Sequence, residues 1–335
     1  MKLKKLVAMV ATAAVLAVGV VGCSSGGQGT GDSSGGTEGK KDDTYIAVIS
    51  KGYQHEFWKT VEQGTQKAAE ELGIKVTFEG PDSETEVDRQ IEMVENAITK
   101  QAKAIMLAPL DNKALLPVVQ KAEEKGIPVI TFDSDLDSDI QKSFVATDNK
   151  AAGAIAAKEM SKRIGGKGKV AIVAHNEGTS TAQERRDGFK EEIEKNHKDI
   201  EIVSIQYSDG DHALALAKAT DIMTANPDLK GLYATNEGAV VGVATAVKEK
   251  GKLDDITLIG FDSSDQEIAF LKEKVIDGFV VQNPYNMGYL GVKAANDVLE
   301  GKNVEKRIDT GATYVSLDNF ENDDIQKLLY PLGKK

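Results

Sequence analysis

The sequence predicts an α/β protein made of two doubly wound, Rossmann-like lobes that are joined by a hinge and enclose a ligand cleft. From Thr44 onward, short apolar strands alternate with amphipathic helices, a rhythm typical of βαβ units and mainly parallel sheets covered on both faces. The rhythm runs through twice and restarts after a glycine-rich turn at residues 165–168. A chain of 335 residues, 41% of them hydrophobic, is long enough for two cores.

The first round of elements is expected between residues 45 and 163. Short apolar runs predict strands, and a 3.6-residue apolar periodicity that ends near Gly73 or Gly126 predicts helices. The expected strands are Tyr45–Ser50, Lys75–Phe78, Ala104–Leu107, Pro128–Phe132 and Ser143–Ala146. The expected helices are Phe57–Gly73, Glu84–Lys100, Asn112–Lys125 and Asn149–Arg163.

The second round follows the same criteria to residue 300. Its expected strands are Lys169–Val173, Glu201–Gln206, Gly231–Ala234, Thr257–Gly260 and Gly278–Gln282. Its expected helices are Ala182–Lys195, His212–Ala225, Ala239–Lys250, Gln266–Lys272 and Tyr285–Glu300. We expect lobe one to comprise residues 44–147 and 283–311, and lobe two residues 148–282 and 312–335, with about three chain crossings forming the hinge.

The N-terminal segment has the features of an export signal. A basic start, Met1–Lys5, precedes the apolar run Leu6–Val21 and then Gly22-Cys23. This ending resembles the lipobox of bacterial lipoproteins, and Cys23 is the only cysteine. We therefore expect a signal peptide over residues 1–22, lipidation of Cys23 and a Gly/Ser-rich tether over residues 23–43. The alternative is an ordinary signal peptide that happens to contain a cysteine.

Composition and missing motifs argue against several function classes. A formal net charge of −12 is unfavourable for binding nucleic acid. No predicted strand leads into a G-x-S-x-G elbow or is followed by G-x-G-x-x-G, and no Walker motif is present, so we expect neither an enzyme nor a cofactor. The four histidines lack metal-ligand spacing. A transcription regulator would need a DNA-binding domain where this chain has its export signal.

Polar residues follow many of the predicted strands. In open parallel sheets, ligands bind beyond the carboxyl ends of the strands, and two lobes would bring these ends together. Carboxylate and amide groups there suit a ligand covered in hydroxyls, and aromatic rings suit the C–H faces of a sugar. The candidates from this rule are Lys51, His55, Phe57, Trp58, Asp133, Ser134, Asn236, Asp262 and Gln282. Their alternatives are helix capping for Asp262 and core packing for one of the two adjacent aromatics.

From Thr44 to about Ser316 the chain resembles the ribose-binding type of periplasmic sugar-binding proteins, which have the type I fold. The matching segments include GIPVITFDSD, GTSTAQERRDGF, LYATNEGAVVG, LIGFDSSDQE and FVVQNPYNMG. The resemblance implies ligand contacts for the candidates above and adds Arg185. Three positions, Trp58, Ser134 and Gly210, differ from ribose binders, which leaves a hexose, a polyol or a deoxysugar open.

The resemblance implies a monomeric substrate-binding lipoprotein that captures a monosaccharide or polyol by hinge closure. It would be anchored to the outside of the bacterial cell membrane and deliver its ligand to an ABC permease. Two alternatives remain open at this point. One is a ligand-sensing lipoprotein that signals to a membrane receptor, and the other is a binder of a non-sugar small molecule.

Overall fold

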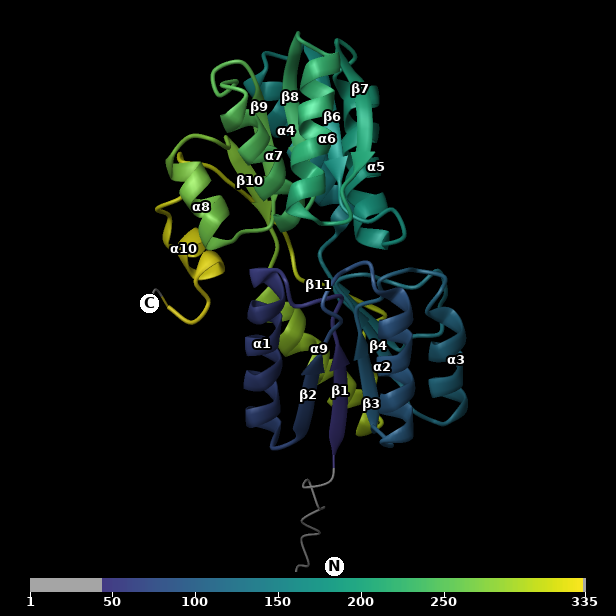
Figure 1. Cartoon of the computed structure of the whole chain (residues 1–335). Coiled ribbons are helices and arrows are strands. Elements are labelled where there is room, and N and C mark those ends of the chain that lie inside the picture. The colour runs from purple at the N-terminus through teal and green to yellow at the C-terminus, as the bar shows by residue number, and fades with distance from the viewer. Residues whose placement is uncertain (1–43, 334–335) are drawn as a thin grey trace, which may run out of the picture. The chain divides into compact units, whose positions relative to one another are not determined.

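The computed structural model describes residues 44–333, which form two α/β lobes, each built on a six-stranded sheet (Figure 1). The predicted fold class is therefore the observed one. The expected signal peptide, lipidation site Cys23 and tether lie outside the described residues. Within residues 44–333, no helix has both the length and the apolar character needed to span a membrane.

The sheet of lobe one is entirely parallel. Its strands are β1 (Tyr45–Ile49), β2 (Lys75–Glu79), β3 (Ala104–Leu107), β4 (Val129–Phe132), β5 (Ser143–Ala146) and β11 (Arg307–Asp309), in the order β11-β5-β4-β3-β1-β2. Side chains alternate across a strand. Thus Ile46 and Val48 face the helices α1 (Glu56–Leu72) and α9 (Pro284–Leu299), whereas Ala47 and Ile49 face α2 (Val87–Thr99) and α3 (Leu116–Glu124).

Lobe two repeats this plan with one antiparallel edge strand. Its strands are β6 (Gly168–Ala174), β7 (Ile200–Tyr207), β8 (Leu229–Ala234), β9 (Thr257–Phe261), β10 (Gly278–Val281) and β12 (Thr313–Val315), in the order β12-β10-β9-β8-β6-β7. Helices α4 (Asn149–Arg163) and α5 (Ser180–Asn196) cover one face. The other face packs against α6 (His212–Ala225), α7 (Glu237–Glu249), α8 (Asp265–Lys272) and the C-terminal α10 (Asp323–Leu329).

The two longest helices of lobe one, α1 and α9, pack with their backbones in contact. A Cβ atom at Gly64 of α1 would lie 2.0 Å from the carbonyl oxygen of Tyr285, and one at Gly288 of α9 would lie 2.1 Å from that of Val61. Only glycine fits at such a crossing. This packing fixes the position of α1, whose N-terminus carries the aromatic residues of the candidate site.

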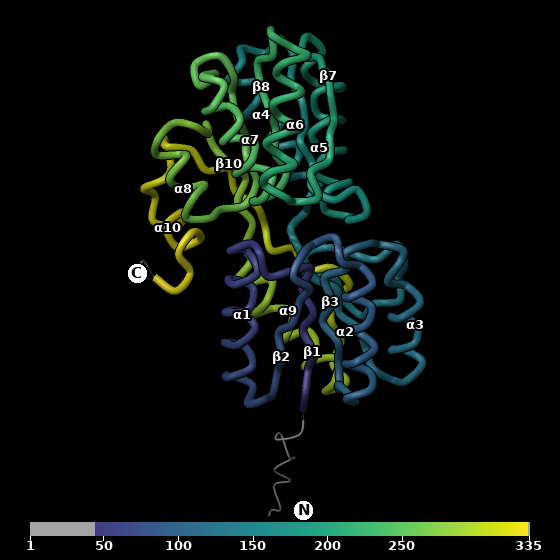
Figure 2. Tube along the Cα trace, in the orientation of Figure 1, coloured from purple at the N-terminus to yellow at the C-terminus, as the bar shows by residue number. Residues whose placement is uncertain are grey.

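The described chain passes between the lobes three times. It crosses after β5, after β10 and between β11 and β12, as the tube in Figure 2 shows. Two crossings are hydrogen-bonded to each other, because the Thr147 hydroxyl donates to the Gly311 carbonyl at 3.0 Å and the Arg307 guanidinium donates to the Thr147 carbonyl at 3.0 Å. Short bonded crossings of this kind are suited to hinge motion.

Several element boundaries differ from those predicted. Helix α2 begins at Val87 and not at Glu84, because residues 83–86 form a turn in which the backbone NH of Glu86 donates to the Ser83 carbonyl. Helix α3 begins at Leu116 because Asp111 holds the preceding residues in a turn. The sequence did not reveal β11, β12 or α10. The two strands have three residues each, too few to show a periodicity.

Candidate functional site

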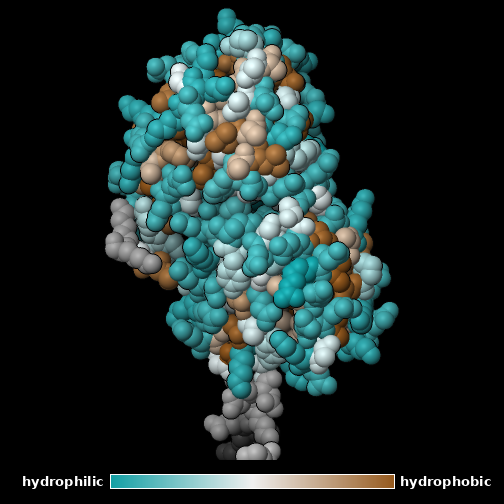
Figure 3. Space-filling view, in the orientation of Figure 1, coloured by the Kyte–Doolittle hydropathy of each residue, from teal (hydrophilic) through white to brown (hydrophobic). Residues whose placement is uncertain are grey.

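One cavity, with an empty volume of about 280 Å³, is lined by side chains of both lobes. On the face shown in Figure 3, the junction between the lobes is mostly hydrophilic. Nine of the ten predicted ligand-binding residues line the cavity, and Glu84 and His175 join them. The nine are Lys51, His55, Phe57, Trp58, Asp133, Arg185, Asn236, Asp262 and Gln282.

The tenth predicted residue, Ser134, does not line the cavity. It is fully buried, and its hydroxyl donates to the Asp133 carboxylate at 3.1 Å. Ligand contact by Ser134 stays a prediction, and in this conformation the residue supports Asp133.

Lobe one contributes a buried ion pair to the cavity. The Lys51 ammonium lies 2.7 Å from the Asp133 carboxylate, and both side chains are almost fully buried. Lys51 also donates to the Thr181 hydroxyl of lobe two at 3.3 Å. A buried charge of either sign is costly unless it is paired, so the two residues stabilise each other and present donors and acceptors toward the same space.

The aromatic wall is formed by Phe57 and Trp58, whose rings meet edge to face at 4.9 Å. Both side chains belong to the core of lobe one and both line the cavity. Core packing and cavity lining are therefore not alternatives for these two residues, because the edge of the core forms one wall of the cavity. The Trp58 indole NH donates to the Glu84 carboxylate at 2.8 Å.

Lobe two holds Arg185 in one fixed orientation. Its Nε donates to the Asn149 side-chain oxygen and its Nη1 to the Thr235 carbonyl, both at 2.8 Å. The guanidinium carbon lies 3.8 Å from the centre of the Phe261 ring, a cation–π geometry. An arginine side chain has five N–H donors, so donors remain for a ligand after these two bonds. The residue that the resemblance added to the candidates, Arg185, thus lines the cavity.

Asp262 is held by bonds on both of its oxygens. It accepts from the Glu237 backbone NH at 3.0 Å and from the Gln282 amide at 2.6 Å. Burial raises the pKa of the Asp262 carboxyl above its ordinary value, and the nearby Arg185 guanidinium opposes this rise. Asp262 does not cap α8, because Ser264 does so. The Gln282 side-chain oxygen has no hydrogen-bond partner within residues 44–333, so it is available to a donor.

Asn236 serves both the fold and the cavity. Its side-chain oxygen caps α7 by accepting from the Ala239 backbone NH at 2.9 Å. The same side chain lines the cavity. Capping and ligand contact are thus compatible for one asparagine, because the oxygen is used by the helix and the NH₂ group is left for other partners.

His175 was missed by the sequence analysis. Its ring nitrogens lie 2.8 Å and 2.9 Å from the hydroxyls of Thr235 and Thr181. Burial lowers the pKa of His175 well below its ordinary value, and Arg185 acts in the same direction, so the ring is neutral. The sequence did carry a signal for this residue. His175 directly follows β6, so the rule that ligands bind beyond the carboxyl ends of strands would have selected it. Glu84 gave no such signal, since it lies five residues beyond the end of β2.

Hydrogen bonds join the two lobes around the cavity. The Glu237 carboxylate of α7 accepts from the backbone NH groups of Glu56 and Phe57, at 3.1 and 3.2 Å, at the N-terminus of α1. The Asn176 amide donates to the Glu84 carbonyl at 3.1 Å. These bonds describe a closed conformation. Burial raises the pKa of Glu237 to about 7.

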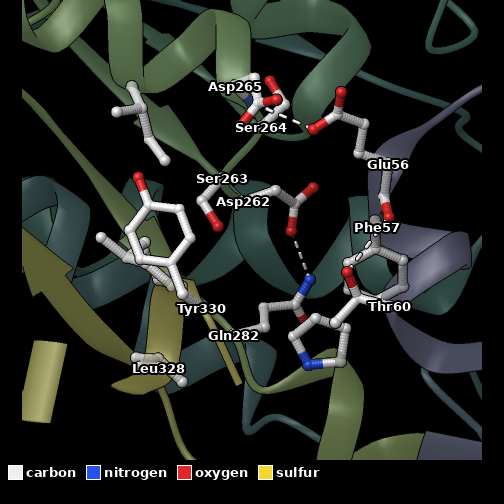
Figure 4. Close-up of a pocket in the computed structure, with 14 residues that line it drawn as sticks. Glu56, Phe57, Thr60, Asp262, Ser263, Ser264, Asp265, Gln282, Leu328 and Tyr330 are labelled. Carbon is white, nitrogen blue, oxygen red and sulfur yellow. Dashed lines mark hydrogen bonds between the residues drawn. The ribbon is translucent and has the colours of Figure 1, made fainter. Parts of the chain in front are cut away.

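A second pocket lies beside the first, on the side of α8 and α10 (Figure 4). It shares Phe57, Asp262 and Gln282 with the first cavity, and the Asp262–Gln282 hydrogen bond stands between them. The C-terminal segment closes this pocket with Tyr330 and the leucines before it. A further bond between the lobes crosses it, from the Asp265 backbone NH to the Glu56 carboxylate at 3.0 Å.

Comparison with known proteins agrees with this geometry. Residues 46–303 match the periplasmic binding protein domain family. The chain belongs to this family. Its members are extracytoplasmic binding proteins of transport systems, so the prediction of a binding protein that is not an enzyme is confirmed.

Curated relatives of this family member include a ribose-binding and an allose-binding protein. The ribose import binding protein RbsB of Bacillus subtilis is 29% identical over 270 residues, which cover 81% of this chain and 86% of that protein. The D-allose-binding periplasmic protein of Escherichia coli is 31% identical over 259 residues, which cover 75% and 83%. The predicted resemblance to sugar-binding proteins of ABC importers is confirmed.

Solved structures of binding proteins superpose over most of this family member. An ABC transporter solute binding protein from Agrobacterium vitis with bound D-fucose is 39% identical, with a TM-score of 0.83 and coverage of 85% of this chain and 100% of that one. A carbohydrate transporter solute binding protein from Agrobacterium radiobacter, in complex with D-arabinose, is 37% identical, with the same TM-score and coverage of 85% and 98%.

Proposed function

We propose that this protein is the substrate-binding lipoprotein of an ABC importer that captures a monosaccharide or related polyol by closure of its two lobes. The observation that carries the proposal is the composition of the interlobe cavity. Fixed charged and amide groups from both lobes surround an aromatic floor, and each ligand hydroxyl can both donate and accept.

The proposed ligand contacts are shared between the lobes. Lys51, His55, Phe57, Trp58 and Asp133 would contact the ligand from lobe one. Arg185, Asn236, Asp262 and Gln282 would contact it from lobe two. A ligand held by both sets stabilises the closed conformation, because it can gain all of these contacts only when the lobes are together.

The proposed division of the chain follows the three crossings. Lobe one would comprise residues 44–147 and 283–311, and lobe two residues 148–282 and 312–335. Residues 1–22 would be a signal peptide, and Cys23 would carry the lipid that anchors a monomeric protein outside the cell membrane. An ABC permease would then recognise the closed form.

A thermal-shift screen of the protein without its first 43 residues, against a panel of monosaccharides and polyols, tests the ligand class. A ligand at 100 times its dissociation constant should add about 2.7 kcal/mol to the free energy of unfolding. Amino acids and nucleosides serve as controls, since an amino acid needs charged partners for both its carboxylate and its ammonium group. Shifts with these controls alone would refute the proposal.

A further inference from the structure

We propose that Glu84 determines ligand specificity by accepting a hydrogen bond from a hydroxyl on an exocyclic carbon of the sugar, in a notch left open by Gly210. The inference rests on the proposed sugar-binding function and narrows its ligand class. It assigns hexoses that carry a hydroxymethyl group as ligands in preference to pentoses and 6-deoxyhexoses.

Glu84 is a buried acid, and only one of its two carboxylate oxygens accepts a hydrogen bond from the described residues. It is 3% exposed and lies in the turn before α2. Its Oε1 accepts from the Trp58 indole NH at 2.8 Å, and its backbone carbonyl accepts from Asn176 of lobe two. Its Oε2 makes no hydrogen bond to any residue between 44 and 333, although the side chain lines the cavity. This acceptor oxygen is therefore available to a ligand donor in the cavity.

The notch lies beside Gly210, which has no side chain to fill it. Gly210 has a φ of +71°, a left-handed conformation that favours glycine. A carbon atom at its Cβ position would lie 3.2 Å from Asn236 Nδ2, 3.4 Å from His55 Nε2 and 3.6 Å from Glu84 Oε2. Three polar side-chain atoms from three separate segments therefore surround one space. A side chain at residue 210 would press against these atoms, so the glycine keeps the space beside them clear.

His55 supports a polar occupant for the notch. The side chain is 3% exposed, yet neither ring nitrogen has a hydrogen-bond partner within the described residues. Its nearest acidic groups, the carboxylates of Glu84 and Glu237, are 3.9 Å away, too far for a hydrogen bond. A hydroxyl in the notch could donate to Glu84 Oε2 and accept from Asn236 Nδ2, with the His55 ring beside it.

The position of the notch favours an exocyclic group over a ring hydroxyl. Gly210 does not line the main cavity, but it lines a wider neighbouring pocket together with His55, Asp82 and His212. His55 lines both. The notch thus lies at the edge of the ring site, toward this wider pocket, where a substituent that projects from the ring would reach. Ring hydroxyls would face the Lys51–Asp133 pair and Arg185 at the other side.

Calorimetry on matched sugars tests the inference. Each hexose is compared with the pentose that lacks only its hydroxymethyl group: D-allose with D-ribose, D-glucose with D-xylose, and D-galactose with L-arabinose. The 6-deoxy form of each hexose completes the set. The unaltered protein should bind its hexose at least about tenfold more tightly than either counterpart, because a hydrogen bond to a charged group is lost.

The variant Glu84→Gln removes the charge and keeps an oxygen that can accept from Trp58. It should weaken hexose binding by about tenfold or more and leave pentose and 6-deoxyhexose binding unchanged. Glu86→Gln, an exposed residue in the same turn, should change nothing. Trp58 is the only tryptophan in the chain, so an unchanged emission spectrum of Glu84→Gln shows that the aromatic floor is intact.

Two results would overturn the inference. One is equal affinity of the unaltered protein for a hexose, its pentose and its 6-deoxy form, a comparison that does not depend on how the variant folds. The other is an equal loss for all three sugars in Glu84→Gln, which would limit Glu84 to supporting Trp58. Failure to bind any sugar would instead refute the proposed function, so the two failures are distinguishable.

Discussion

Asp133 and Asp262 occupy matching positions in the two lobes, and both have unusual backbones. Each directly follows a Phe at the end of a strand, β4 or β9, and each has a positive φ, of 59° and 78°. A left-handed conformation costs a residue with a side chain about 1–2 kcal/mol. Such strain persists where surrounding contacts enforce it, and it occurs often at functional sites. Here it turns each carboxylate from the sheet into the cavity.

We expect Arg185 and Asp262 to carry much of the binding energy. Each can hold two ligand oxygens through charge-assisted hydrogen bonds in a closed site. Arg185→Ala and Asp262→Asn should each cost about 2–4 kcal/mol of binding free energy, or about 30- to 1000-fold in affinity. Calorimetry would measure this after melting curves without ligand show that both variants fold. Lys195→Ala, exposed on the same helix as Arg185, is the control, and wild-type affinity in both site variants would contradict the assignment.

At the scale of elements, the cavity depends on how helix ends meet. The N-terminus of α1 presents its backbone NH groups to Glu237, the first residue of α7. A carboxylate is favourable at a helix N-terminus because the free NH groups there carry partial positive charge. Since the two helices belong to different lobes, we expect this contact to be lost when the lobes separate.

The Glu237 contact predicts that closure depends on pH. Burial raises the pKa of Glu237 to about 7 in the closed form, while His55 and the two backbone NH groups oppose the rise and Asp262 adds to it. Opening exposes the carboxyl and returns its pKa toward an ordinary value near 4.5. The closed form then binds more protons between these values, so ligand affinity should rise as pH falls from about 8 to 5, by less than tenfold per unit for one proton.

Glu237→Gln isolates this effect because the amide keeps an acceptor for α1 and does not titrate. Its ligand affinity, followed by Trp58 fluorescence titration, should vary less with pH than that of the unaltered protein. Glu267, whose pKa burial and Glu237 both raise, would retain part of the dependence. Glu249→Gln, exposed on α7, should keep the full dependence. An unaltered pH profile in Glu237→Gln would contradict the role given to this carboxyl.

The crossing of α1 and α9 gives a second prediction for this scale. A Cβ at Gly64 would lie 2.0 Å from a backbone oxygen that cannot move alone, so Gly64→Ala must push the helices apart. Overpacking of this kind typically costs about 1–3 kcal/mol of unfolding free energy. Thermal melting should show a decrease of several degrees. Gln63→Ala, exposed on α1, should melt like the unaltered protein. An unchanged melting temperature for Gly64→Ala would contradict the close packing of the two helices.

At the scale of the whole molecule, the two lobes share one plan, a six-stranded sheet covered by helices. They differ in one edge strand, because β11 of lobe one is parallel to its neighbour and β12 of lobe two is antiparallel. Both sheets place their strand ends at the cleft, so residues as distant as Lys51 and Gln282 line one cavity. The C-terminal α10 packs on lobe two beside α8 (Figure 1) and closes the second pocket. The first element of the described chain is β1, and the N-terminal end of this strand lies on the side of lobe one that faces away from lobe two (Figure 1).

The proposed lipid attachment at Cys23 predicts where the protein is found in a cell. Cys23→Ser, expressed in a bacterium, should move the protein from the membrane fraction to the soluble extracytoplasmic fraction, because it removes the only site for the anchor. Immunoblots of fractionated cells would measure this. Ser25→Ala, two residues away in the tether, is the control. Equal membrane association of Cys23→Ser and the unaltered protein would contradict the anchor.

Most elements were predictable because their signals are local. The 3.6-residue periodicity and the left-handed Gly73 end of α1 identify that helix without reference to the rest of the fold. Buried strands such as β3 are short apolar runs flanked by turns. By contrast, β11 and β12 have three residues and exist only because a neighbouring strand offers hydrogen-bond partners. The first residue of α2 could not be predicted from the local apolar pattern either, because it depends on the turn formed by residues 83–86.

The sequence by itself determined the two-lobed α/β plan and nine residues of the cavity, because strand-end position and motif order are encoded along the chain. Only the tertiary structure decided which of these side chains meet and in what role. It joined Ser134 to Asp133, Glu84 to the Trp58 indole and His175 to two threonines through hydrogen bonds. These contacts join residues up to 60 positions apart, and their geometry depends on how helices and sheets pack, which no local pattern specifies.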